Sequence, residues 1–185
     1  MPLAFLTPKK DVYIASAFPD INFNNHKKNE GDFLFVGTFT GADDIFRSLL
    51  QFDLFDPGAG IPSNRTIQEA VLFLHLSRND NAGVAQVYCF RLFDSFNANE
   101  VTFNTVPMSH FPISDFAGGA VTPAATPISV ALNITSLVQS WYLGLIPNNG
   151  IELRGIENGN NNILGFRSTR FTNRSFWPSL VVNWA

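Results

Sequence analysis

This chain of 185 residues has little of several things that would point at once to a function class. It has a single cysteine, Cys89, so no disulfide can form within the chain, and its place in an alternating run is typical of a small buried hydrophobic residue. Charged residues make up only 15%, the net charge is -3, and the basic clusters are no larger than Lys9-Lys10 and Lys27-Lys28. Nucleic acids and anionic membranes are therefore not expected as partners.

Long apolar runs are also missing. No segment approaches the roughly 20 continuous apolar residues of a membrane-spanning helix, so we expect no membrane insertion. The stretch from Met1 to Lys10 carries its positive charges after its apolar residues, which is the reverse of a secretory signal peptide. We expect no signal peptide in the sequence as given, which fits a protein deposited from inside a cell and equally fits a form already trimmed.

Catalytic and metal-binding motifs are scarce. His26, His75 and His110 are isolated, with no H-E-x-x-H, no H-x-H and no cysteine nearby, so the sequence predicts neither a transition-metal centre nor an enzyme. The adjacent carboxylates of Asp43 and Asp44 belong to the oxygen-rich kind of loop that calcium prefers, although the same pair also suits a solvated turn. We predict no cofactor, with calcium at Asp43 and Asp44 as the one candidate metal.

Short runs of alternating apolar and polar residues fill most of the chain, with Gly, Pro, Asn and Asp between them. In one of them, Ala70, Leu72, Leu74 and Leu76 share a face that needs a second sheet to cover it. The runs are Asp11–Ser16, Phe33–Thr38, Ile45–Phe55, Ile67–Leu76, Val84–Phe93, Ile128–Leu132, Gly150–Gly155, Asn162–Ser168 and Ser179–Trp184. They predict an all-β fold, an antiparallel β-sandwich or jelly roll, as a single domain over residues 1–185.

One short helix is predicted, over about Thr135 to Tyr142. Asn133 and Thr135 are residue types that cap helices. The apolar residues behind them recur at three- and four-residue spacing, which gives the helix one face to bury: Leu137, Val138 and Trp141. Gly144 and Pro147 should end the helix, and Asn149-Gly150 should then form a turn with positive backbone angles.

Several motifs follow one another in a definite order. They are Asp11–Ile14 with Phe18-Pro19, Phe35–Gly37, Arg47–Leu54, Ile61-Pro62 followed by Ile67, Ala70 and Leu72, Asn133–Trp141, Asn149–Ile151, and Phe166–Ser168 followed by Pro178 and Leu180. In this order they resemble the DNRLRE-type domain, a β-sandwich family grouped with carbohydrate-binding module family 96, over most of the chain. The sequence departs from that pattern at Phe103, where the family has tryptophan, and at Asn133, where it usually has aspartate.

The resemblance implies a jelly-roll fold, no catalysis, and a location at a cell surface, at a spore surface or outside the cell. Members of the family occur fused to polysaccharide-degrading enzymes and also as short stand-alone proteins of spore-forming bacteria. Glycan binding is thus implied as one alternative only, because a fold does not fix a function.

A sugar site needs an aromatic platform beside polar side chains. Trp177 is a candidate platform, and Arg154, Arg167 and Arg170 could meet an acidic glycan, although the Pro178 that follows Trp177 also suggests inward packing. Several phenylalanines lie outside the alternating runs, where they either pin loops to the core or form an exposed patch: Phe18, Phe23, Phe39, Phe111, Phe116, Phe171 and Phe176.

The leading hypothesis starts from residues 1–10, which form either an N-terminal arm or an edge strand. Prolines bracket a short apolar run whose candidate assembly residues are Leu3, Phe5 and Leu6. Such a segment could add to a sheet edge of a neighbouring copy, with Leu3 and Phe5 in its pockets, and repeated addition would give a filament or another homo-oligomer. The protein would then be a non-enzymatic structural protein of a bacterial or spore surface. The alternative is a carbohydrate-binding module that recognises a cell-wall or environmental polysaccharide.

Overall fold

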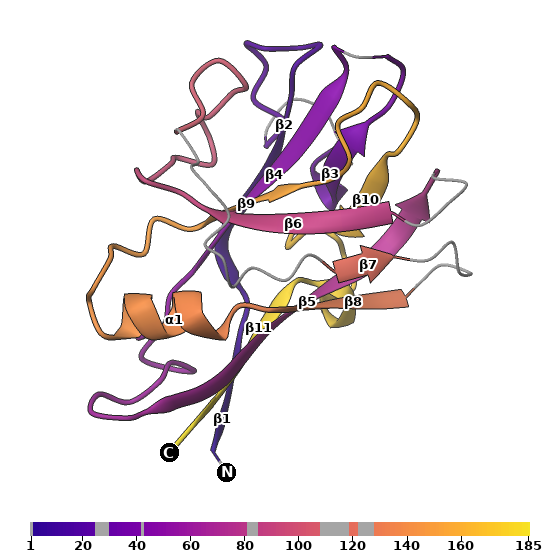
Figure 1. Cartoon of the computed structure of the whole chain (residues 1–185). Helices are drawn as coiled ribbons and strands as arrows, with labels where there is room; N and C mark the ends of the chain where they lie inside the picture. The colour runs from indigo at the N-terminus through magenta and orange to yellow at the C-terminus, as the bar shows by residue number, and fades with distance from the viewer. Residues whose placement is uncertain (1, 25–29, 42, 81–84, 108–118, 122–127) are drawn as a thin grey trace.

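The computed structural model describes residues 2–24, 30–41, 43–80, 85–107, 119–121 and 128–185. Its strands are β1 (Leu3–Leu6), β2 (Pro8–Ala15), β3 (Phe33–Thr38), β4 (Ile45–Phe52), β5 (Ile67–Asn79), β6 (Ala85–Arg91), β7 (Gly119–Val121), β8 (Ile128–Asn133), β9 (Ile151–Arg154), β10 (Leu164–Arg167) and β11 (Ser179–Trp184). The described residues also contain one α-helix, α1 (Thr135–Tyr142), and two 3-10 turns, η1 (Glu30–Asp32) and η2 (Arg174–Phe176). The predicted all-β, sandwich-like fold with one short helix is confirmed (Figure 1).

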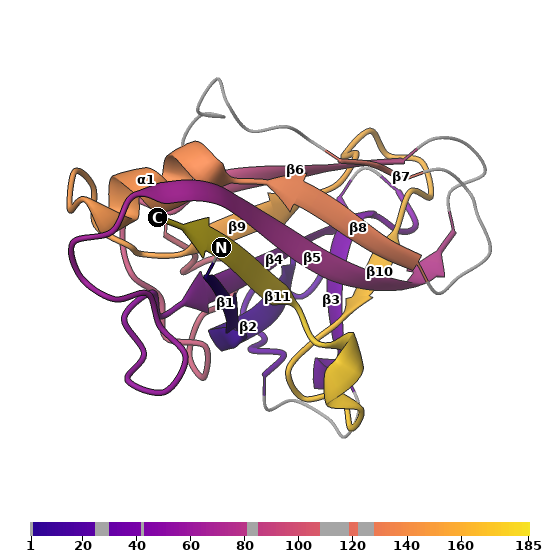
Figure 2. The same ribbon diagram turned by 90° about the horizontal axis from the view of Figure 1, so that it is seen from below.

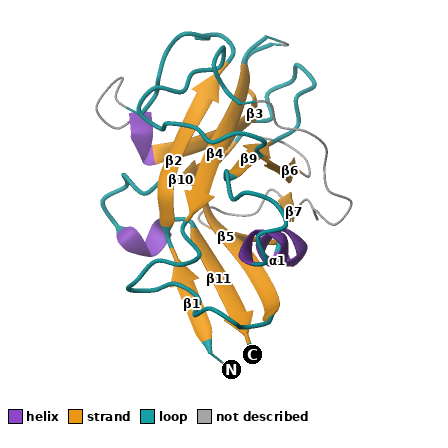
Figure 3. Ribbon diagram, turned by 90° about the vertical axis from the view of Figure 1, so that its left-hand side faces the viewer, coloured by secondary structure: helices purple, strands orange, loops and turns teal. Residues whose placement is uncertain are grey.

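The strands pair antiparallel in one sheet that curls on itself. In one half, which we call sheet A, β5 lies between β11 and β8, and β1 forms the edge beyond β11. In the other half, sheet B, β4 lies between β2 and β9, and β6 lies beyond β9 with the short β7 at its side. Figures 2 and 3 show the two halves at an angle to each other, with both chain ends at the β1–β11 edge.

Strand β3 joins the two halves. Its first part pairs with β10 of sheet A through Phe33 to Val36, and its last residues pair with β4 of sheet B through Gly37 and Thr38. Gly37 lies at this change of partner with a φ of 100°. A Cβ at Gly37 would lie 2.6 Å from the carbonyl oxygen of Asn162, so the corner requires glycine.

The core lies between the inner faces of the two halves. The predicted shared face of β5 is confirmed, since Ala70, Leu72, Leu74 and Leu76 are fully buried. Trp141, predicted on the buried face of the helix, and Trp184 of β11 also belong to this core and are 5% and 8% exposed. Cys89 faces the same core, as expected, and its burial raises the pKa of the thiol above its usual value.

Helix α1 begins and ends at the predicted residues, and its buried face is the predicted one of Leu137, Val138 and Trp141. The N-cap residue is Ile134, which has no side-chain cap, rather than Asn133 or Thr135. The side-chain oxygen of Asn133 does accept a hydrogen bond at 3.1 Å from the amide of Thr135, the first residue of the helix. The Thr135 hydroxyl accepts a hydrogen bond from the Ala70 amide at 2.9 Å, and this bond fixes the start of the helix to β5. The predicted end at Gly144 is confirmed by its φ of 68°.

Several strand boundaries differ from the prediction by a few residues. Strand β2 begins at Pro8 rather than Asp11, because Pro8 and Lys10 already pair with β4, while β4 ends at Phe52 rather than Phe55 and β5 continues to Asn79 rather than Leu76. The short strand β7 lies outside all of the predicted runs. Of the two forms predicted for residues 1–10, the structure has the edge strand, since β1 pairs with β11 of its own chain.

Candidate functional site

The edge strand β1 has one hydrogen-bonded neighbour and one open side. Its partner is β11, with Leu3 opposite Asn183 and Phe5 opposite Val181. The amide of Trp184 donates to the carbonyl of Pro2 at 3.4 Å, so the alternation of an antiparallel ladder turns the backbone groups of Leu3 and Phe5 away from β11. The open side of β1 thus presents the amides and carbonyls of Leu3 and Phe5.

The side chains of β1 alternate strictly between the core and the surface. Ala4 and Leu6 are each 3% exposed and belong to the main core cluster. Leu3 and Phe5 are 50% and 64% exposed. The pockets predicted for Leu3 and Phe5 belong to a neighbouring copy, so that part of the hypothesis stays a prediction. Leu6, the third candidate assembly residue, lies instead in the chain's own core, because the pleat of β1 puts Ala4 and Leu6 inside.

An apolar strip continues from β1 across the outer face of sheet A. Val181 lies opposite Phe5, and Val71 lies opposite Val181, so three apolar side chains form one row across three strands. Phe73, two residues further along β5, is 38% exposed. We call Leu3, Phe5, Val71, Phe73 and Val181 the apolar strip.

A groove of about 420 Å³ borders the end of β1. One side of it is formed by residues 5–9, and the other side by Asp53 and the turn from Asp56 to Ala59. The turn is held by its own hydrogen bonds, since the Gly60 amide donates to the Asp56 carbonyl at 2.7 Å. The structure therefore borders part of the β1 edge with a preformed recess.

A hollow with a volume of about 770 Å³ lies at the loop end of β2, β3 and β4. Its lining residues, which define the aromatic hollow, are Tyr13, Ser16, Ala17, Phe18, Phe23, Phe39, Thr40, Gly41, Asp43, Asp44 and Phe46. The Tyr13 ring stacks on Phe23 with a centroid distance of 4.4 Å, and Phe18 meets Phe23 edge-on at 6.2 Å. Phe18 is 51% exposed, which leaves much of its ring open to a ligand.

The loop phenylalanines therefore divide between the two predicted roles. Phe23 is 5% exposed and pins its loop to Tyr13, whereas Phe18 presents its ring to solvent. Phe39 is half-buried in the wall of the aromatic hollow. Phe111 and Phe116 lie outside the described residues.

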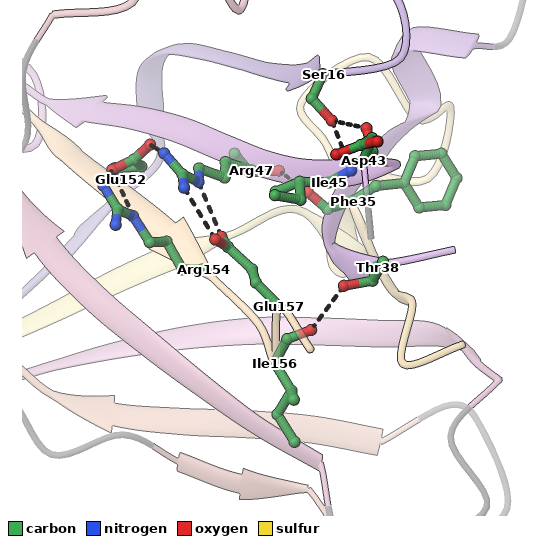
Figure 4. Close-up of polar contacts among 11 residues, drawn as sticks. Ser16, Phe35, Thr38, Asp43, Ile45, Arg47, Glu152, Arg154, Ile156 and Glu157 are labelled. Carbon is green, nitrogen blue, oxygen red and sulfur yellow. Dashed lines mark hydrogen bonds and ion pairs between the residues drawn. The ribbon is translucent and has the colours of Figure 1, made fainter. Parts of the chain in front are cut away.

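The calcium candidates Asp43 and Asp44 lie at the rim of the aromatic hollow. The Asp44 carboxylate accepts hydrogen bonds from the hydroxyl and the amide of Thr40, at 2.9 and 3.2 Å. The Ser16 hydroxyl donates to the carbonyl of Asp43 and accepts from the Ile45 amide at 2.8 Å (Figure 4). Among the described residues, no group of three His, Cys, Asp or Glu side chains is placed to hold a metal ion, so the geometry matches the turn rather than a calcium cage.

Two of the predicted sugar-binding residues share a neighbour. The guanidinium of Arg167 lies over the Phe171 ring at 3.9 Å and over the Phe33 ring at 4.4 Å. The indole N–H of Trp177 donates to the carbonyl of Phe171 at 2.7 Å, and Trp177 is half-buried. These contacts hold Arg167 and Trp177 against the loop that joins β10 to β11.

The other two predicted sugar-binding residues are engaged elsewhere. Arg170 donates twice to the carbonyl of Gly31, at 3.0 and 2.9 Å. Arg154 lies on the outer face of sheet B, with its guanidinium over the Phe90 ring at 4.5 Å. Arg154 is thus not brought together with Trp177.

Arg154 belongs instead to an ionic cluster that the sequence analysis missed. Glu152, whose side chain is 1% exposed, accepts from Arg154 at 2.7 Å and lies 3.6 Å from the Arg47 guanidinium. Arg47 also binds Glu157 in a two-pronged contact, at 2.8 and 2.9 Å (Figure 4). Burial acts to lower the pKa of Arg47, but the hydrogen bonds and charges of Glu157 and Glu152 outweigh it and raise that pKa.

A loop packs on the same face of sheet B and reaches Arg47 of this cluster. The segment from Leu92 to Val106 packs on the outer face of sheet B, with Phe96 and Val101 buried against Val12 and Leu49. Phe103 of the same segment lies 5.6 Å from the Arg47 guanidinium. The sequence signal was available in the alternation Glu152–Arg154, but nothing in the sequence states which loop lies over that face.

No protein-family model matches the chain, and no curated protein matches it either. The resemblance to the DNRLRE-type domain therefore stays a prediction. Within the described residues, every helix is too short or too polar to cross a membrane.

Proposed function

We propose that this protein is a non-enzymatic structural protein of a bacterial cell or spore surface that self-associates through the β1 edge. The observation that carries the proposal is the combination, on one short strand, of open backbone groups and two exposed apolar side chains, Leu3 and Phe5. Natural sheets usually protect such an edge with charge, proline or a bulge. Here the prolines stand outside β1, at Pro2 and Pro8.

A second copy supplies the groups that this edge lacks. Backbone hydrogen bonds from an added strand would give affinity, and the apolar strip would gain cover on the outer face of sheet A. In the strand-donation form, β1 leaves β11 of its own chain and takes the same place beside β11 of the next copy. Repetition of this step does not close and gives a fibre.

The first experiment compares the full chain with Phe5→Lys by sedimentation velocity and negative-stain electron microscopy. We expect filaments or other large assemblies from the full chain and monomers from Phe5→Lys, because a lysine at an edge opposes strand addition. Leu145→Lys is the matched control, since Leu145 is 71% exposed and lies outside the apolar strip. Monomers in all three preparations would refute self-association.

A disulfide trap separates donation from simple edge contact. Leu3 and Asn183 face each other in the β1–β11 ladder, at a pair whose backbone groups do not bond one another, which is the closer kind of pair. In Leu3→Cys/Asn183→Cys, donation predicts a ladder of linked chains on a denaturing, non-reducing gel. A single monomer band beside intact assemblies would restrict the contact to edges that keep their own β1.

The aromatic hollow supports a second candidate function, polysaccharide binding. It offers an exposed ring, Phe18, beside hydroxyl and carboxylate groups, and its volume of about 770 Å³ is in the range of small-ligand sites. We expect Phe18→Ala to weaken retention in affinity gels containing a bound polysaccharide. Phe55→Ala is the control, because Phe55 is 55% exposed outside the hollow, and Trp177→Ala tests the site predicted from sequence.

A further inference from the structure

The residues that line the aromatic hollow indicate the charge of the ligand that it would bind. Its wall is made of aromatic rings, with Tyr13 between Phe23 and Phe46 at centroid distances of 4.4 and 6.1 Å. The faces of such rings carry partial negative charge and attract a cation placed over them. Phe18, with half of its surface exposed, is the ring that an incoming ligand can reach.

The formal charges at the hollow are of one sign. Asp43 and Asp44 lie at its rim, and none of the described residues that line it is a lysine, arginine or histidine. Arg78 contacts the wall from outside, with its guanidinium 4.9 Å from the Phe39 ring. Arg78 is itself paired with Asp80, at 3.1 Å, so its charge is balanced outside the hollow.

We infer that the aromatic hollow selects a sugar that carries a free amino group, such as a glucosamine unit of a deacetylated polysaccharide. This inference rests on the proposed polysaccharide binding and names the class of sugar. The apolar face of the sugar ring packs on Phe18, and its ammonium group lies near the carboxylates of Asp43 and Asp44. An acidic glycan, for which Arg154, Arg167 and Arg170 were candidates, would meet two like charges at this site.

The geometry around the carboxylates suits this role. Thr40 holds Asp44 in place through two hydrogen bonds, and Ser16 fixes the backbone on either side of Asp44 through Asp43 and Ile45. The acidic rim is thereby ordered before a ligand arrives, which reduces the entropy lost on binding. Asp43 is exposed, so its carboxylate can meet an ammonium group without burial of an unpaired charge.

The test is a calorimetric titration with three trisaccharides of the same linkage: a glucosamine trimer, its N-acetylated form and a glucose trimer. At a pH where the amines are protonated, we expect the glucosamine trimer to bind about tenfold more tightly than the other two, as a cation–π contact and an ion pair together would supply. Asp43→Asn should reduce that ratio toward one, and Phe18→Ala should weaken all three ligands.

Asp94→Asn controls for attraction to the net negative chain, because Asp94 is exposed and lies outside the hollow. Equal binding of the three trimers would overturn the selectivity and leave polysaccharide binding standing. Absence of binding by all three would overturn both. If the selectivity for the glucosamine trimer survives Asp43→Asn, or if Asp94→Asn lowers it as much as Asp43→Asn does, the assignment to this hollow is overturned.

Discussion

The two outer faces of the sandwich differ in the kind of side chain that they bury and the kind that they expose. On sheet B, the segment from Leu92 to Val106 packs over Val12 and Leu49, and the charges of Arg47, Glu152 and Arg154 lie paired on the same face. On sheet A, the apolar strip remains exposed, with Phe5 at 64% and Leu3 at 50%. Charge is thus buried on one face while apolar surface is left open on the other.

The difference teaches where each face finds its partner. A buried carboxylate between two guanidiniums is tolerated because both partners come from the same chain. Among the described residues, the apolar strip and the open edge of β1 have no such partner, which directs attention to a second molecule. The predictions that follow break or sharpen this contrast.

The largest effect is expected at the covered face. Glu152→Ala removes the carboxylate between Arg47 and Arg154 and leaves two arginines close together. We expect a loss of about 3–5 kcal/mol in the free energy of unfolding, the usual result of breaking a buried ion pair from one side. Urea unfolding followed by far-UV circular dichroism measures it.

Glu157→Ala is the matched control for this prediction. It removes the other carboxylate that binds Arg47, but the Glu157 side chain is 19% exposed against 1% for Glu152. The loss should be clearly smaller, because solvent can reach the arginine that remains. Equal losses in the two variants would show that water is not excluded from the cluster.

A smaller effect is expected within β1, where the two kinds of face meet on one strand. Leu6→Ala should cost about 2–5 kcal/mol, since Leu6 is 3% exposed in the core. Phe5→Ala should change the stability of the monomer by no more than about 0.5 kcal/mol. Both are measured at a dilution where assembly is absent, and a negligible cost for Leu6→Ala would mean that β1 is not docked in the isolated chain.

The smallest effect concerns His75 on the open face of sheet A. Burial and the charge of Arg167 lower the pKa of His75 from 6.5, and its ring stacks on Phe176 at a centroid distance of 4.2 Å. The folded state therefore binds a proton less readily than the unfolded chain, so stability is complete above about pH 6.5 and falls as the pH drops through the lowered pKa.

His75→Phe keeps a ring against Phe176 and removes the titration. The fall in melting temperature between pH 7 and pH 5, roughly the range in which an ordinary histidine titrates, should be less steep in this variant than in the parent chain. An unchanged slope would place the pH dependence in other groups. An NMR titration in which the His75 signal shows the ordinary pKa of histidine would contradict the lowered pKa directly.

The elements of the fold could be predicted from sequence because each follows from a local pattern. Alternation located β5 and the helical spacing of Leu137, Val138 and Trp141 located α1, and both are confirmed. The position of the N-cap could not be predicted from the sequence, because the Thr135 hydroxyl binds the Ala70 amide of a strand that is distant in sequence. Whether residues 1–10 form an arm or an edge strand depended on whether β11 offers an unpaired side to β1, and local sequence patterns do not reveal this.

The candidate sites were harder to predict than the strands. The aromatic hollow gathers Phe18 and Phe39 from loops that only the corner at Gly37 brings together. Leu49 is buried on the outer side of sheet B because the segment 92–106 packs over it, whereas alternation predicts that this side is exposed to solvent. Residue type suggested an aromatic platform, but position in space decided which ring is exposed.

The pairing of Leu3–Leu6 with Leu180–Asn183 also affects the order in which parts of the fold can form during synthesis. Strand β1 is synthesised long before β11, so its ladder cannot close until β11 has been made, and its contacts are among the most distant in sequence that this chain makes. Throughout that interval the strand stays unpaired beside other growing chains on the same messenger RNA. In the proposed strand donation, β1 could therefore be exchanged between two copies before either has finished folding.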